Sequence, residues 1–159
     1  MKHIIISLFA ITLISSCASA PFDLEKANRS ITPQLAKSSE NYQGQTVVWG
    51  GLIIQTENFT EQSQIEVLAY PLDEYGEPQR HSQAQGRFLI KQSGFLEPAQ
   101  YAAGRWISVI GSVAESKQGQ VGQAAYRYPQ VNASQLHLWP TRDESDSRTR
   151  FHFGIGIGL

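Results

Sequence analysis

The chain has 159 residues, which is about the length of one domain. Thirteen Lys and Arg against 14 Asp and Glu give a formal net charge of −1, which excludes a protein held to nucleic acid by a broad basic surface. Hydrophobic residues make up 41%, enough for an apolar core, so a chain that is disordered throughout is excluded as well. The single cysteine excludes an intrachain disulfide and a zinc site built from several cysteines.

The N-terminal residues have the pattern of an export signal. A short positive start at Lys2 is followed by an apolar run over residues 4–14. That length is typical of the apolar core of a signal peptide, and it is too short for the roughly 20 residues of a membrane-spanning helix. We therefore expect a signal peptide at residues 1–16, with cleavage between Ser16 and Cys17.

The end of this signal resembles a bacterial lipobox. In Ile14-Ser15-Ser16-Cys17, the resemblance implies that the thiol of Cys17 receives a diacylglycerol and that its freed amine receives a further acyl chain such as palmitate. Two or more acyl chains hold a protein firmly, at about 0.8 kcal/mol per buried methylene. Ala18 follows, where such lipoproteins usually carry Asp if they stay in the inner membrane, so the outer membrane is implied. The alternative is an ordinary secretory signal with a chance cysteine.

The next segment, residues 17–40, is mixed and polar and contains Pro21 and Pro33. Leu24, Ile31 and Leu35 form a weak stripe at helical spacing, but the prolines interrupt it. We interpret residues 17–40 as the acylated N-terminus and a tether.

Residues 41–139 show short alternating segments separated by turn residues, which is typical of strands. The first segment, residues 46–54, is dense in β-forming residues, and its Gly50-Gly51 pair permits a bend. Further strands are expected at residues 64–70, 86–91, 104–113, 124–128 and 131–139, with turns at 71–78 and 117–120 and one short helical turn starting at Glu97-Pro98.

Five or six short strands with a helix-like link before the fourth predict a mainly β fold. A closed barrel removes the unpaired edges that such strands would otherwise expose. We expect a small OB-like β-barrel with one short helix, and a β-sandwich is the alternative.

Several motifs follow one another through this body: Tyr70-Pro71-Leu72-Asp73, Gly86-Arg87-Phe88-Leu89, Gly94-Phe95-Leu96-Glu97-Pro98, Tyr101 and Leu136-His137-Leu138-Trp139. Together with the lipobox, this ordered set resembles the Slp family of starvation-inducible outer-membrane lipoproteins over residues 17–139. The resemblance implies a lipid-anchored protein of the cell envelope that is linked to stationary-phase or stress physiology, and it implies no catalytic residues.

The chain finishes with a polar linker at residues 140–150 and an apolar segment at residues 151–159. In that segment Phe151, Phe153, Ile155, Ile157 and Leu159 alternate with His152 and three glycines. A strand here would carry every large apolar side chain on one face. It would cover the protein's own core, or add to a partner's sheet, self-associate or contact lipid; disorder is the third interpretation.

The residues that carry chemistry do not form a known catalytic or metal pattern. His81, His137 and His152 are far apart and lack metal-ligand spacing, there is no Gly-x-Ser-x-Gly, and acylation would consume the thiol of Cys17. We expect no enzyme, no metal, no cofactor beyond the lipid and no nucleic-acid partner. The candidate binding surface for sugar or peptide consists of Tyr70, Tyr75, Tyr101, Tyr126 and Tyr128. The predicted function is a non-enzymatic lipoprotein in envelope integrity or stress response, and the alternative is an envelope module that binds glycan or peptide.

Overall fold

The structure is a computed structural model that describes residues 24–141. The predicted signal peptide, the lipid site at Cys17, the linker beyond Thr141 and the apolar segment with His152 lie outside these residues. No helix within the described part of the chain has the length and apolar character needed to cross a membrane.

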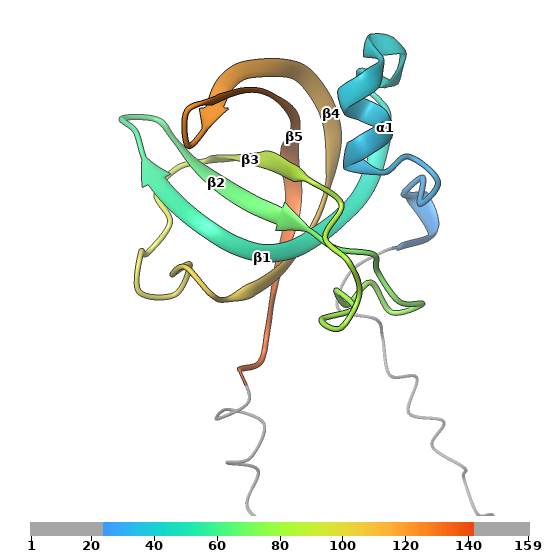
Figure 1. Ribbon diagram of the computed structural model, residues 1–159. Coiled ribbons are helices and arrows are strands. Elements are labelled where there is room, and N and C mark those ends of the chain that lie inside the picture. Colours follow the sequence, from blue (N-terminus) through green and yellow to red (C-terminus); the bar gives the residue numbers. More distant parts are fainter. Residues whose placement is uncertain (1–23, 142–159) are drawn as a thin grey trace, which may run out of the picture.

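Five strands close into a barrel in the order β1-β2-β3-β5-β4 (Figure 1). The strands are β1 (Thr46–Asn58), β2 (Gln62–Ala69), β3 (Arg87–Ser93), β4 (Trp106–Val121) and β5 (Ala124–Trp139). The short β3–β5 pairing is parallel and every other pairing is antiparallel. Because the ring is closed, each of these five strands has a paired neighbour on both sides. The prediction of a mainly β, barrel-like fold is confirmed.

Two details of the predicted strands are wrong. The residues expected to form a turn, 117–120, belong to β4, and the chain reverses at Gly122, which has a φ of +60°. The two strands expected after that turn are one strand, β5, which continues through Pro129. This proline faces a shift in the register of β4 between Ala114 and Lys117, where the regular ladder is already interrupted.

The short helical turn predicted at Glu97-Pro98 is present in the link between β3 and β4, where the Tyr101 amide donates to the Glu97 carbonyl over 3.0 Å. The regular helix lies elsewhere. The α-helix, α1 (Pro33–Ser38), precedes β1. Thr32 caps it by accepting from the Leu35 amide, and Pro33 takes the first helical position, where no amide hydrogen is needed. A proline that we interpreted as a helix breaker therefore starts the helix.

The described part of the predicted tether is folded against the barrel. It contains the short turns η1 (Leu24–Lys26) and η2 (Glu40–Tyr42) beside α1, and Ile31 and Ala36 are buried in the barrel's core. The indole nitrogen of Trp49 donates to the Ile31 carbonyl over 2.6 Å. Interpretation as a tether is thus wrong for these residues, because Ile31 and Ala36 pack into the core, whereas Leu35 of the weak apolar stripe is exposed.

Alternate residues of all five strands fill the barrel. The largest are Trp49 and Phe88, whose rings meet edge to face with centroids 5.3 Å apart. Gly51 lies inside the first strand, where an added Cβ would be 1.9 Å from the Leu68 carbonyl oxygen. The predicted glycine pair therefore permits a close approach of β1 and β2, while the irregular register falls just beyond it, between Ile53 and Gln55.

Candidate ligand-binding site

The five tyrosines of the predicted binding surface do not lie together. Tyr126 and Tyr128 form an edge-to-face pair on β5, with centroids 4.7 Å apart. Tyr70 contacts the ring of Trp106, Tyr101 packs against the core, and Tyr75 is 61% exposed on the loop after β2. The structure therefore brings together only one pair from this set.

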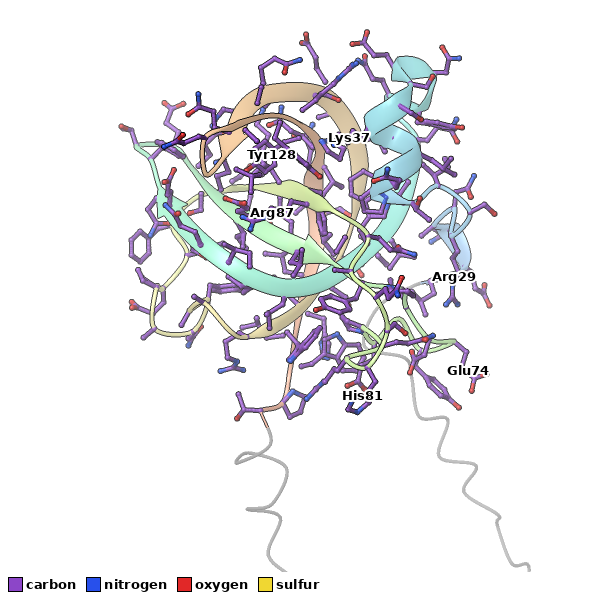
Figure 2. All side chains as sticks on the ribbon, in the orientation of Figure 1. Arg29, Lys37, Glu74, His81, Arg87 and Tyr128 are labelled. Carbon is purple, nitrogen blue, oxygen red and sulfur yellow. The ribbon has the colours of Figure 1, made fainter. Side chains whose placement is uncertain are left out.

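That pair belongs to a polar cluster on the outer side of β2, β3 and β5. Arg87 Nη1 lies 2.6 Å from Glu66 Oε1, and the Tyr128 hydroxyl lies 3.1 Å from the same oxygen. The Tyr126 hydroxyl accepts from the Arg87 amide over 2.8 Å, and Lys37 Nζ lies 3.8 Å from the centre of the Tyr126 ring. Figure 2 shows Lys37, Tyr128 and Arg87 on the side of the barrel next to α1.

The electrostatics of this cluster follow from its contacts. The hydrogen bond to Glu66 raises the pKa of Arg87, and burial raises the pKa of the Tyr128 phenol, with a further rise from the Glu66 charge. Tyr128 therefore stays protonated as a donor, and Arg87 stays charged. Arg87 and Tyr128 both hydrogen-bond with Glu66, and such mutual pairing is typical of a network that stabilises the fold.

The network holds the β4–β5 hairpin against β2 and β3. Besides the tyrosine contacts, Lys117 Nζ lies 3.2 Å from Gln64 Oε1 on β2. In OB barrels this face and the neighbouring loops bind oligonucleotides and oligosaccharides. In this chain the same face is engaged by the protein's own hairpin.

A cleft of about 200 Å³ lies elsewhere, between the segment before α1, β1 and the chain that follows β2. Its apolar lining includes Ile31, Trp49, Tyr70 and Leu72, and its polar lining residues are Arg29, Thr32 and Gln85. Of the predicted surface, only Tyr70 belongs to it. Sequence reasoning missed the others because they come from three separate segments, one of which we interpreted as tether.

Arg29 connects two walls of this cleft. Its Nη1 donates to the Glu74 carbonyl over 3.1 Å, and its Nη2 donates to the Asp73 carbonyl. Figure 2 shows Arg29 and Glu74 on the same side of the molecule, away from Lys37 and Tyr128. None of the residues that line the cleft is acidic, and Arg29 gives it a positive charge.

His137 and Ser108, which could carry chemistry, are held by packing and hydrogen bonds inside the protein. Within residues 24–141 no group of three or more His, Cys, Asp and Glu side chains is placed to hold a metal ion. His137 packs on Trp139 with centroids 4.4 Å apart, and burial lowers its pKa. The buried Ser108 hydroxyl donates to the Gly76 carbonyl over 2.7 Å and accepts from Trp139 Nε1 over 2.9 Å, so it ties the loop after β2 to the barrel.

Comparison with known proteins shows the family of the chain. It matches the family model described as Outer membrane lipoprotein Slp family over residues 14–155. It is 28% identical over 138 residues to Outer membrane protein Slp of Escherichia coli (strain K12), which covers 82% of this chain and 71% of that relative. An uncharacterized protein of Haemophilus influenzae is 33% identical over 129 residues, covering 79% of this chain and 70% of the relative. The Uncharacterized lipoprotein YeaY of Escherichia coli (strain K12) is 26% identical over 144 residues, which are 87% and 72% of the two chains.

The match spans the whole barrel and the predicted resemblance and location are confirmed: the chain belongs to the Slp family of outer-membrane lipoproteins.

Proposed function

We propose that this envelope lipoprotein is non-enzymatic, that Cys17 carries its lipid, and that its barrel serves envelope integrity or the stationary-phase and stress response. The observation that carries the proposal is the extent of the family match. It starts at residue 14, the first residue of the lipobox, and it continues through the whole barrel. A match that includes residues 14–17 together with the barrel supports a lipid anchor at Cys17.

The surroundings of the polar residues support a binding or scaffolding role. Glu66, Arg87 and Tyr128 are engaged with one another, and Ser108 is engaged with the loop after β2. Hydrogen bonds among these side chains fasten the strands and the loop after β2 to one another, which is what a scaffold requires.

The anchor is tested by replacing Cys17 with alanine in the full-length gene. We expect the wild type in the outer-membrane fraction, with a mass equal to the chain from Cys17 plus acyl groups. The Cys17→Ala variant should leave that fraction, while the control Ser19→Ala, just beyond the lipobox, should not. An unmodified thiol in the purified wild type, or a Cys17→Ala variant that still sediments with the outer membrane, would refute the lipid assignment.

The physiological role is tested in a strain that lacks the gene. We expect lower survival in stationary phase and greater sensitivity to detergent, restored by the wild type and not by Cys17→Ala. Equal survival of the deleted and complemented strains would contradict a role in stress tolerance.

The cleft supports a second function, in which the barrel binds a peptide or glycan of the envelope. A ligand at 100 times its dissociation constant adds about 2.7 kcal/mol to the free energy of unfolding, so thermal unfolding in the presence of cell-wall fragments detects it. Unchanged unfolding temperatures would count against this function.

Self-association through residues 151–159 is a separate proposal, based on the alternation of large apolar residues with glycine. Deleting this segment should reduce the particle mass in analytical ultracentrifugation of the detergent-solubilised protein. A monomer with and without the segment would refute it.

A further inference from the structure

The cleft beside β1 has the size of a pocket for one side chain. Its volume is about 200 Å³. An apolar cavity of about 150 Å³ accommodates a guest the size of benzene, and sites for drug-sized molecules start at roughly 300 Å³. One large apolar side chain therefore fits between Trp49, Tyr70 and Leu72, which line the cleft.

The charge of the cleft specifies a second feature of the ligand. Arg29 is its one charged lining residue, and the contacts that orient the guanidinium are the backbone carbonyls of Asp73 and Glu74, which are neutral. A guanidinium has five N–H donors in a fixed plane and pairs well with a carboxylate. These two hydrogen bonds orient Arg29 and leave further N–H donors of its guanidinium for a ligand.

The polar and apolar lining residues together distinguish between classes of ligand. Sugar hydroxyl groups that face Ile31 and Leu72 would find no hydrogen-bond partner on these side chains, and each such group costs free energy. An apolar side chain has no such cost, and a carboxylate one or two atoms away from it can face Arg29. The C-terminal residue of a peptide combines these two groups.

We infer that this cleft binds the C-terminal residue of a peptide, with a large apolar side chain between Trp49 and Leu72 and the α-carboxylate on Arg29. The inference deepens the second function proposed above by naming the ligand class. The inference does not depend on the lipid at Cys17. Mass spectrometry tests the lipid and titration with a ligand tests the cleft, so a failure of one proposal is distinguishable from a failure of the other.

Calorimetric titration of the full-length protein in detergent tests the inference with two probes, acetyl-alanyl-leucine and its C-terminal amide. We expect the acid to bind at least tenfold more tightly than the amide. Arg29→Gln should bring the affinity for the acid down to that for the amide. Gln85→Glu keeps the size of a lining residue and adds a negative charge. It should lower the affinity for the acid at least tenfold and leave the affinity for the amide unchanged.

Arg80→Gln is the matched control. Arg80 lies in the loop after β2, as Glu74 does. It contacts Glu77 and the Pro140 carbonyl, and it does not line the cleft. We expect this variant to bind both probes as the wild type does. Equal affinities for acid and amide, binding of neither probe, or the same loss in Arg80→Gln as in Arg29→Gln would each overturn the inference. If Arg29→Gln does not fold, Gln85→Glu decides the question alone.

Discussion

Replacing Trp49 with phenylalanine tests how strongly the segment before β1 is fastened to the barrel. Trp49 is 2% exposed, and its indole nitrogen donates to the carbonyl of Ile31, which is 4% exposed. Phenylalanine keeps an aromatic ring in the core and removes this donor. The Ile31 carbonyl then stays buried without a partner, because α1 and the barrel still cover it.

The expected loss follows from two contributions. A buried acceptor left without its partner costs about 1–3 kcal/mol. The smaller ring leaves a void on the order of 40 Å³, which adds about 1 kcal/mol at roughly 24 cal/mol per Å³. We therefore expect the free energy of unfolding to fall by about 2–4 kcal/mol, a large part of the 5–15 kcal/mol that is typical of a domain.

The assay is urea unfolding followed by far-ultraviolet circular dichroism, with linear extrapolation to water. Trp139→Phe is the matched control, because its indole donates to Ser108, whose hydroxyl keeps its own hydrogen bond to the Gly76 carbonyl. Its loss should be about 1–2 kcal/mol, of which about 1 kcal/mol is the same void contribution, because no buried acceptor is left without a partner. Equal losses for the two variants would refute the reasoning that an unsatisfied Ile31 carbonyl dominates the effect.

Three further predictions concern the strands and their surface. Gly51→Ala should prevent folding, since its Cβ would lie 1.9 Å from the Leu68 carbonyl oxygen, and a variant that resists trypsin as the wild type does would contradict this. Glu66→Gln should cost about 1 kcal/mol in urea unfolding, because its 2.6 Å contact with Arg87 is partly exposed; a loss above 3 kcal/mol would contradict a partly screened pair. Burial lowers the pKa of His137 from its ordinary 6.5, so the unfolded chain binds more protons as the pH falls below that value. Stability should therefore decline as the pH is lowered from 7.5 to 5.5, and His137→Gln should reduce this decline; an unchanged slope would assign it to other groups.

The barrel could be predicted because each strand carries its own signal. In β2, Ile65, Val67 and Ala69 alternate with polar neighbours, and all three are buried. Alternation identifies a strand from a few adjacent residues, and the need to remove free edges then favours closure. The continuation of β5 through Pro129 could not be predicted, because a proline disfavours the interior of a strand and the register shift in β4 that accommodates it is not visible in the local sequence.

The candidate site was mostly hidden in the sequence for a related reason. Arg29, Trp49 and Leu72 meet at one cleft although they come from a segment interpreted as tether, from β1 and from the loop after β2. The tyrosines were grouped by residue type, and the fold then separates them, with Tyr75 in solvent and Tyr101 against the core. Residue type identifies which side chains can bind, whereas the packing of distant segments decides which of them share a cavity.

The folding of residues 24–42 onto the barrel limits how far the protein extends from its membrane. With the lipid on Cys17, as proposed, only residues 18–23 separate the bilayer from the first described residue, Leu24. Seven residue steps reach at most about 25 Å when fully extended. A domain of this length has a radius of gyration of about 13 Å, so the barrel stays within roughly one diameter of the lipid surface. Any partner that it binds has to approach the membrane itself.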